Sequence, residues 1–444
     1  MMINLINSAI DIVAENKSKF VNMESAFTRT RDWPFDSNVK FQIFRPRTTT
    51  RHDINTFYLY SKNHSYSRIT RGNYSRRRQL IDPIFYKEVN KEYLKQIKYN
   101  QNLSIHKTYK NFYLYAIDGM TIRFDYNKKL RKDFKVKEGN LNYINPSEAK
   151  FSAIMDLLNG HIIDGELGNF RQSERELMKI NVKNSMDIID FNQSILTMDR
   201  GFASLELMAW MKELNINFVQ RINKEFYKAE INRIKDNDSP INIKLNASRL
   251  RGFKDSELKE KYRKESYLNL RLVTVELESG EIERLLTNIP PEIMSTEDIY
   301  HIYGLRWTIE TNYNTLKNRF EIENFTSNTK ENIKQDIYAT VIKYNIGFNY
   351  YSICNKLVEN KIRKENKEAL KDYEYKVDFA NLIRNLNDFL YLMIINPDKS
   401  NVSTYTSWLI YESCQEPNKI KNNRSYPIIR MGEQKKYSRS YAKV

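Results

Sequence analysis

Runs of apolar residues divide the middle of the chain into short predicted strands. The run from Phe112 to Asp118 is apolar and aromatic and ends in an acid, which is typical of a strand buried on both faces. Gly119 then predicts a turn, and the alternating residues 121–124 predict a new strand. Residues 150–167 predict a hairpin of two further strands joined at an Asn-Gly dipeptide.

The following segment repeats the strand pattern with helices between the strands. Ser173 predicts the start of a helix through about residue 180, residues 194–199 predict a buried strand that ends at Asp199, and a helix over 203–214 precedes a strand over 216–220. Three antiparallel strands followed by helix, strand, helix and strand predict an α/β sheet of the ribonuclease H type. Both aspartates then lie at the carboxyl ends of interior strands, where ligands bind in open α/β sheets.

Changes in composition predict five segments. Residues 1–105 are interpreted as a mostly helical N-terminal DNA-binding domain, and residues 106–221 and 293–358 as the two parts of the α/β core. Residues 222–292 predict a β-rich insertion between them. Residues 359–444 predict a helical region with a basic tail, which is as consistent with a disordered end as with a binding arm. An amphipathic helix over residues 379–395 is predicted to pack within the subunit, with dimer contacts as the alternative.

The helix after the insertion carries a polar face. Ser295 caps a helix predicted over residues 296–320, on which Tyr303, Arg306, Glu310 and Lys317 lie within a sector of about 60°. An apolar stripe beside them predicts that the helix packs on the core. Taken alone, such a set is typical of a surface helix with ion pairs between successive turns. The two upstream aspartates favour a functional site.

Positive charge is concentrated near the N-terminus. The 444 residues include 72 Lys and Arg against 55 Asp and Glu, a net charge of +17, which favours a polyanionic partner, although an AT-rich coding sequence would also enrich lysine. Residues 41–80 hold a series of arginines with Asp53 as their single acid. Asn73 is predicted to cap a helix that places Arg76, Arg77 and Arg78 in its first turns, where they would contact DNA phosphates. A solvated basic face is the alternative.

The sequence indicates an intracellular protein without a membrane segment. Its cysteines, Cys354 and Cys414, are too few for a disulfide framework and lack zinc-site spacing. The N-terminus lacks the pattern of a secretory signal, and the longest apolar run, 389–395, is too short to span a bilayer. We expect a soluble, cytoplasmic protein.

Three motifs together resemble a known family. Asp118-Gly119, the segment Met198-Asp199-Arg200-Gly201-Phe202, and the spacing Tyr-x2-Arg-x3-Glu-x6-Lys from Tyr303 to Lys317 resemble the DDE transposases of bacterial insertion sequences with the Y-R-E-K signature. The resemblance covers about residues 105–355, and the β-rich insertion matches the architecture of that family.

The resemblance implies a metal-dependent DNA transposase. Asp118, Asp199 and Glu310 are expected to hold two Mg²⁺ ions, for which Mn²⁺ can substitute, with Asp118 bridging them. Arg306 and Lys317 are expected to bind phosphates, and Tyr303 to donate a hydrogen bond to one. A structural salt bridge between Asp118 and Arg306 or Lys317 is the alternative. The implied partners are double-stranded DNA at terminal inverted repeats, target DNA and a second subunit.

The implied reaction is cut-and-paste transposition through a hairpin intermediate. Family members that form hairpins often stack a tryptophan of the insertion on a flipped base, whereas residues 222–292 contain no tryptophan. Two other functions stay open at this point. One is a non-catalytic, site-specific DNA-binding protein derived from a transposase, and the other is a host nuclease of the same fold.

Overall fold

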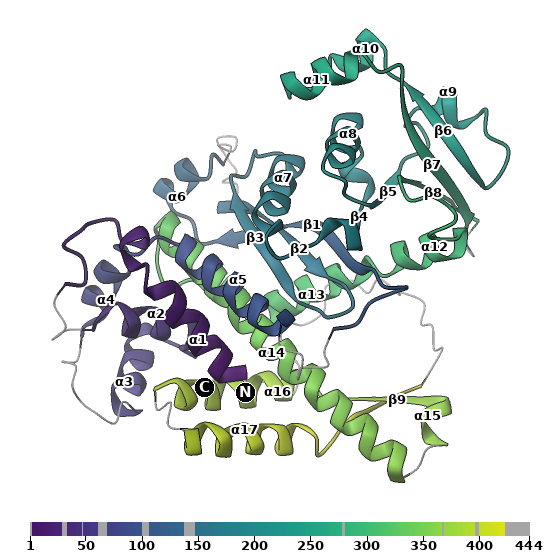
Figure 1. Cartoon of the computed structure of the whole chain (residues 1–444). Helices are drawn as coiled ribbons and strands as arrows, with labels where there is room; N and C mark the ends of the chain where they lie inside the picture. The colour runs from purple at the N-terminus through teal and green to yellow at the C-terminus, as the bar shows by residue number, and fades with distance from the viewer. Residues whose placement is uncertain are drawn as a thin grey trace.

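A mixed sheet of eight strands runs through the centre of the molecule, with helices on both faces (Figure 1). The computed structural model describes residues 2–28, 33–46, 48–60, 69–99, 106–136, 147–277, 280–365, 368–395 and 399–421. The strands are β1 (Tyr113–Phe124), β2 (Ser147–Asp156), β3 (Ile162–Gly168), β4 (Ser194–Met198), β5 (Phe218–Ile222), β6 (Asp238–Lys244), β7 (Tyr267–Glu276), β8 (Ile282–Thr287), β9 (Tyr373–Lys376) and β10 (Asn418–Lys421). The predicted α/β class is confirmed.

The α-helices form an N-terminal group, a set that covers the sheet, and a C-terminal group (Figure 1). They are α1 (Met2–Ala14), α2 (Phe35–Phe44), α3 (Thr50–Tyr60), α4 (Arg71–Arg78), α5 (Ile84–Tyr99), α6 (Lys128–Asp133), α7 (Glu174–Ser185), α8 (Leu205–Glu213), α9 (Lys228–Ile231), α10 (Ala247–Leu250), α11 (Ser256–Arg263), α12 (Thr296–Gly304), α13 (Trp307–Asn318), α14 (Lys330–Glu365), α15 (Ala369–Asp372), α16 (Phe379–Ile395) and α17 (Lys399–Ser413). Short 3₁₀ turns follow α1 and flank β4.

The strand order is that of the ribonuclease H fold with an extension. The sheet runs β3-β2-β1-β4-β5-β8-β7-β6, in which β1, β2 and β3 are antiparallel and β4 and β5 are parallel to β1. Strand β8 pairs antiparallel with β5, so the β-rich segment predicted over residues 222–292 continues the core sheet. The division of the chain into five domains stays a prediction.

Strand β1 is longer than the sequence predicts. Asp118 and Gly119 lie inside this strand, where they pair with Ala153 and Ser152 of β2. The predicted turn at Gly119 is therefore wrong, because β2 supplies backbone partners on both sides of the glycine. The predicted hairpin between β2 and β3 is confirmed, and Gly160 in its turn has a φ of 71°.

The helix predicted over residues 296–320 is broken in two. Ser295 and Asp298 form the predicted capping box at the start of α12, but α12 ends at Gly304 and α13 begins at Trp307. The prediction of one continuous helix is therefore wrong. Helix α13 packs on β1, where the Tyr313 hydroxyl donates to the carbonyl oxygen of Asp118 at 2.7 Å. The change of direction after α12 thus places the Glu310 helix against the aspartate strand.

One arginine connects the base of the insertion to the segment that leads into α12. Arg271 of β7 is 6% exposed and forms an ion pair with Asp238 of β6. Its guanidinium also donates to the carbonyl oxygens of Ile289 and Met294, at 3.2 and 2.7 Å. At its far end the insertion packs on the core, since Tyr262 of α11 donates to a carbonyl of α8. The insertion is therefore held at both ends.

The C-terminal helices pack within the chain. The helix predicted over residues 379–395 is confirmed as α16, which contacts α17, α14 and the N-terminal α1, α2 and α3. The basic tail beyond Lys421 lies outside the described residues, as do Lys62 and Arg68 of the arginine-rich N-terminal segment. None of the helices in the described ranges has both the length and the apolar character that a membrane crossing requires.

Candidate active site

The pairing register of β1 and β4 brings Asp118 and Asp199 together. The parallel pairing of these strands continues up to Ile117 and Met198, and the residue after each of them is Asp118 or Asp199. Asp118 continues in β1, whereas Asp199 leaves the sheet and accepts a hydrogen bond from the Gly201 N–H at 2.9 Å. The sequence predicted this proximity correctly, although Asp118 does not end its strand.

Arg306 lies between two carboxylates at the break between α12 and α13. Its Nη1 is 3.7 Å from Oδ2 of Asp118, and its Nη2 is 3.1 Å from Oε1 of Glu310. The Arg306 side chain is 6% exposed, against 19% for Asp118 and 40% for Glu310. One buried guanidinium thus joins the strand that carries Asp118 to the helix that carries Glu310.

Burial raises the pKa of Asp118 to about 6. The charges of Asp199 and Glu310 contribute to this rise, while the Gly119 N–H and the Arg306 guanidinium oppose it. Asp118 is therefore close enough to Asp199 and to Glu310 to be repelled by both. Such repulsion is typical of carboxylates that share a cationic partner.

The chemistry of this donor set fits a divalent cation that prefers oxygen ligands, such as Mg²⁺. In the arrangement seen here, Arg306 supplies the positive charge between Asp118 and Glu310. Across the described residues, no group of three or more carboxylate, imidazole or thiolate side chains is placed so that it could hold a metal ion. Binding a cation would therefore require the Asp118 and Glu310 side chains to turn from Arg306 toward Asp199.

Tyr303 packs against Arg306 and has an unsatisfied hydroxyl. The Tyr303 side chain is 3% exposed, and the Arg306 guanidinium lies 5.7 Å from the centre of its ring. Neither Tyr303 Oη nor Arg306 Nε has a hydrogen-bond partner within the described part of the chain. Buried donors without partners are uncommon in folded proteins, so this pair is a candidate for contact with an external acceptor.

Lys317 of α13 lies against a part of β1 that follows Asp118. Its Nζ donates to the carbonyl oxygen of Thr121 at 2.8 Å and is 3.6 Å from Oε1 of Glu323. Thr121 is three residues after Asp118, a separation of about 10 Å along a strand. Lys317 of α13 therefore contacts β1 beyond Asp118 and is not in contact with the three carboxylates.

The three predicted N-terminal arginines have different environments. They lie in the last turn of α4, because Thr70 rather than Asn73 caps this helix. Arg78 is 1% exposed, pairs with Asp336 at 3.1 Å and donates to Gln335. The prediction that Arg78 contacts DNA is wrong, because the guanidinium is enclosed by the protein.

The neighbouring arginines are less enclosed. Arg77 is half-buried and donates to the carbonyl oxygen of Trp33 at 2.7 Å. Arg76 is exposed and hydrogen-bonds Asn73 of its own helix. Contact of Arg76 and Arg77 with DNA stays a prediction.

Three residues near the site carry no sequence signal that distinguishes them. Tyr313 donates to the carbonyl of Asp118 and accepts from the buried N–H of Ala153. Gln220 of β5 donates to the carbonyl of Asp199, and Arg175 of α7 donates to the carbonyls of Gly201 and Ala203, at 3.1 and 2.8 Å. The Asp199-x-Gly201 spacing does indicate the turn that these residues hold.

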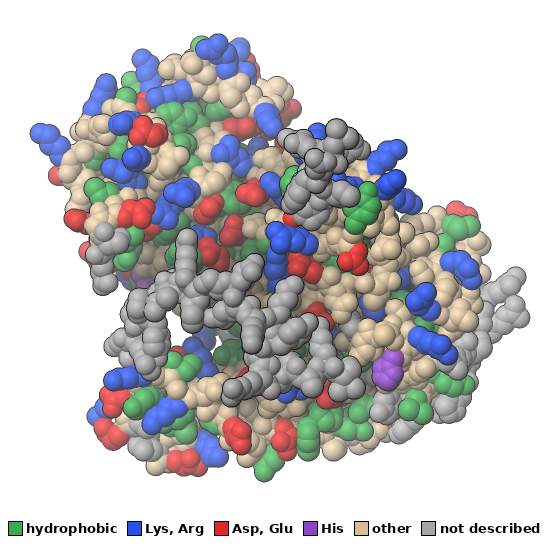
Figure 2. Space-filling model, turned by 180° about the vertical axis from the view of Figure 1, so that it is seen from behind, with side chains coloured by type: hydrophobic (Ala, Val, Ile, Leu, Met, Phe, Trp, Pro, Cys, Tyr) green, Lys and Arg blue, Asp and Glu red, His purple; other side chains and the backbone are tan. Residues whose placement is uncertain are grey.

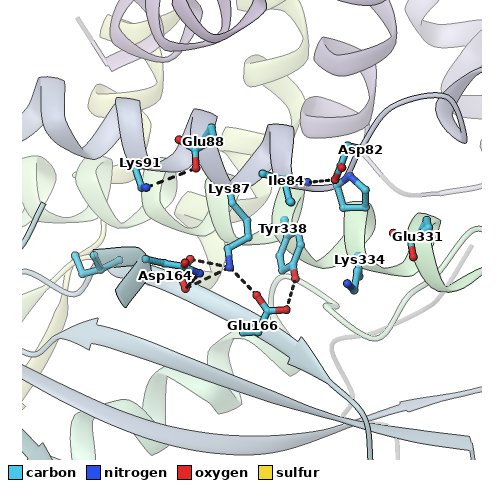
Figure 3. Close-up of a pocket in the computed structure, with 13 residues that line it drawn as sticks. Asp82, Ile84, Lys87, Glu88, Lys91, Asp164, Glu166, Glu331, Lys334 and Tyr338 are labelled. Carbon is cyan, nitrogen blue, oxygen red and sulfur yellow. Dashed lines mark hydrogen bonds and ion pairs between the residues drawn. The ribbon is translucent and has the colours of Figure 1, made fainter. Parts of the chain in front are cut away.

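A separate cavity of about 330 Å³ lies between α5, β3 and α14 (Figure 3). Lys87 of α5 points into it and pairs with Asp164 and Glu166 of β3, at 3.0 and 2.7 Å. The hydroxyl of Tyr338 on α14 is 3.5 Å from Glu166. These contacts connect the N-terminal helices to β3, an edge strand of the sheet, so we interpret the cavity as part of a structural junction.

Comparison with known proteins identifies a family and finds a distant structural likeness. The family model described as Transposase DDE domain matches residues 110–346. A cryo-EM structure of the piggyBac transposase synaptic complex with hairpin DNA is similar at 9% identity and a TM-score of 0.40, covering 93% of this chain and 80% of that one. No curated protein matches. Because the family match spans more than half of the chain and includes Asp118, Asp199 and Glu310, the chain belongs to the transposase DDE domain family.

Proposed function

We propose that this protein is a DNA transposase of the Y-R-E-K type found in bacterial insertion sequences, acting in the bacterial cytoplasm. It would cleave DNA strands at the ends of its element and join the freed ends to target DNA. The observation that carries the proposal is the contact of Arg306 with both Asp118 and Glu310, beside Asp199. Three carboxylates from separate elements thereby converge at a sheet position where α/β proteins bind ligands.

Different residues of this site would bind the metal ions and the phosphate in phosphodiester cleavage. Asp118, Asp199 and Glu310 would hold two Mg²⁺ or Mn²⁺ ions, which activate the attacking oxygen and neutralise the leaving oxygen. Arg306 would then exchange its carboxylate partners for a phosphate next to the scissile bond, using its bidentate fork. Tyr303, whose hydroxyl lacks a partner in the described residues, would donate to the same phosphate.

Lys317 would contact the DNA backbone further along β1. Its two partners here, a carbonyl oxygen and a glutamate 3.6 Å away, leave it 32% exposed. We propose double-stranded DNA with terminal inverted repeats as the substrate, and a homodimer as the species that holds both ends. Hairpin formation is not part of the proposal, because the insertion has no tryptophan to stack on a flipped base.

The test is strand cleavage of a duplex that carries the element's own ends, with Mg²⁺ or Mn²⁺ present. Asp118→Asn, Asp199→Asn and Glu310→Gln should each reduce cleavage to background while the protein still binds the duplex. Glu260→Gln, which changes an exposed glutamate of α11, is the matched control and should cleave like the wild type. If all three site variants cleave at the wild-type rate, the assignment is wrong.

A second candidate is a DNA-binding protein without catalysis. The observation in its favour is that Arg306 already neutralises Asp118 and Glu310, so the site is internally paired without a metal ion. Titration with a divalent cation separates the two candidates. The binding protein would show only the general loss of DNA affinity with salt and no cleavage product, whereas the enzyme would gain cleavage.

A further inference from the structure

A groove of about 530 Å³ lies beside the C-terminal half of α14, away from the three carboxylates. This half of the helix extends beyond the sheet and lies near β9 and α15 (Figure 1). One wall carries successive turns of α14 from Ser352 to Arg363, and the other carries β9. Lys107, just before β1, closes one end of the groove.

The walls of the groove are held in place by side-chain to backbone hydrogen bonds. Asn355 of α14 accepts from the N–H of Val377 at 2.8 Å, which fixes the end of β9 against the helix. Asn159 accepts from the Lys107 N–H at 2.7 Å and donates to its carbonyl at 3.0 Å. The groove is therefore present before any partner binds, which lowers the conformational entropy cost of binding.

The charges that line the groove are mainly positive. Four cations line it against two carboxylates, and the two carboxylates pair with cations of the groove itself, Glu359 with Arg363 at 2.6 Å and Glu374 with Lys376 at 3.0 Å. Lys107 is exposed and forms no ion pair with any residue that the structure describes. The groove thus keeps a net positive charge, which suits a polyanion.

Aromatic rings form part of the same surface. Phe348, Tyr351, Tyr373 and Tyr375 line the groove, and Nζ of Lys419 lies 3.9 Å from the centre of the Tyr373 ring. Lys419 belongs to β10, whose residues are all exposed, so a further cation stands beside the groove. The four rings are half-buried and shape the walls of the groove, so the cations are the groups that would contact a polyanion.

The dimensions of the groove fit a stretch of DNA backbone. From Ser352 to Arg363 the helix rises about 16 Å, which spans about five nucleotides at 3.4 Å each. Tyr109 and Phe112 hydrogen-bond each other across a tight turn, so the chain reverses there and Lys107 lies back beside the start of β1. Asp118 is five residues inside β1, so the groove begins on the order of 15 Å from the carboxylates. That separation corresponds to about four base pairs of a duplex.

Seen from behind, Lys and Arg side chains occur both on the lobe of the insertion and on the lobe that contains the end of α14 with β9 (Figure 2). We propose that the groove between α14 and β9 binds the backbone of the DNA duplex about four base pairs from the reacting phosphate. This inference depends on the proposed function, since it gives that reaction a second DNA contact.

The test compares two double variants with the same change in charge. Lys107→Gln with Arg363→Gln removes two cations of the groove, and Lys183→Gln with Lys212→Gln removes two exposed lysines of α7 and α8 as the control. Affinity for a duplex of arbitrary sequence is measured by fluorescence anisotropy against salt concentration, without divalent ions. The groove variant should lose affinity about tenfold and its salt slope should fall by about two, while the control should match the wild type.

A footprint on the element's own ends provides the second readout. Relative to wild type, the groove variant should lose protection from hydroxyl radicals about four base pairs from the cleavage site and keep it elsewhere. Equal affinity, slope and footprint in both double variants would overturn the inference while leaving the proposed function intact. Loss of affinity for a polyglutamate peptide, with DNA affinity unchanged, would also overturn it. Absence of cleavage by wild type would instead count against the proposed function, because the anisotropy comparison needs no catalysis.

Discussion

The hydroxyl of Tyr313 joins α13 to the paired strands β1 and β2, because it donates to the carbonyl oxygen of Asp118 and accepts from the N–H of Ala153. Tyr313→Phe should destabilise the protein by about 1 to 3 kcal/mol, since the buried N–H of Ala153 loses its acceptor. It should also slow cleavage, because Asp118 and Glu310 lie on the two elements that the hydroxyl joins. Chemical denaturation and the cleavage assay measure the two effects.

Tyr344→Phe is the matched control for that change. Tyr344 is also a fully buried tyrosine, but its hydroxyl has no hydrogen-bond partner among the described residues. Removing it should leave stability unchanged or raise it, because the folded state no longer holds an unsatisfied polar group. Equal destabilisation by both substitutions would contradict a specific role for the Tyr313 bridge.

Arg175 positions the turn that follows β4. Its guanidinium donates to the carbonyls of Gly201 and Ala203, two and four residues after Asp199. Arg175→Met should weaken cleavage and raise the divalent-ion concentration needed for half-maximal activity, because the turn that presents Asp199 is no longer held. Arg175→Lys should keep part of the cleavage activity that Arg175→Met loses. A lower rate with an unchanged metal requirement in Arg175→Met would argue against positioning of Asp199.

Replacement by glutamine should reduce stability at Arg78 and DNA affinity at Arg76. Arg78→Gln removes one partner of the buried Asp336 and should cost about 3 to 5 kcal/mol of stability. Arg76→Gln changes an exposed residue and should alter stability by less than about 0.5 kcal/mol. DNA affinity of the folded protein should fall only for Arg76→Gln. A folded Arg78→Gln variant that has lost DNA affinity would restore the role that the sequence suggested for this residue.

His161 should make stability depend on pH. Its Nε2 lies 2.7 Å from the Asn349 amide oxygen, and burial lowers its pKa to about 4. Between about pH 6.5 and pH 4 the imidazole binds a proton in the unfolded chain but not in the folded protein. The stability that comes from keeping His161 neutral is therefore present above pH 6.5 and is lost as the pH falls toward 4. The loss should reach about 3 kcal/mol at pH 4.

The comparison with His161→Gln isolates that contribution. Burial raises the pKa of Asp156 to about 6, so this carboxyl acts in the opposite direction, and the pH profile of wild type alone would mix the two. Denaturation of both proteins at several pH values gives the difference. A difference in unfolding free energy that does not change between pH 7 and pH 4 would contradict the prediction.

The sequence predicted the elements whose pattern is local. Helix α16 matches its prediction at both ends, and the strands and helices of the core appear in the predicted order. Asp118 and Asp199 were placed correctly near one another, because a parallel register determines which residues lie side by side. These features follow from periodicity and strand order alone.

The sequence failed where distant residues decide the structure. Gly304 is a local signal for the end of α12, but the apolar stripe from Ile302 to Phe320 continues through Leu305 and favours a continuous helix. Gly119 has the composition of a turn, but a long β2 keeps it in a strand. Arg78 belongs to a basic run, and only the fold places Asp336 of α14 beside it. For Gly119 and Arg78 a partner far away in the sequence overrides the local preference.

The pairing of β8 with β5 gives the insertion a second role, which is to cover one edge of β5. A shortened chain that ran directly from β5 to α12 would keep every predicted catalytic residue. It would also leave the backbone groups on one edge of β5, the edge that pairs with β8, without partners, next to the turn that presents Asp199. Such a strand is a template for association with another chain. The insertion therefore protects the core from self-association, and any reduced version of this enzyme would need another cover for β5.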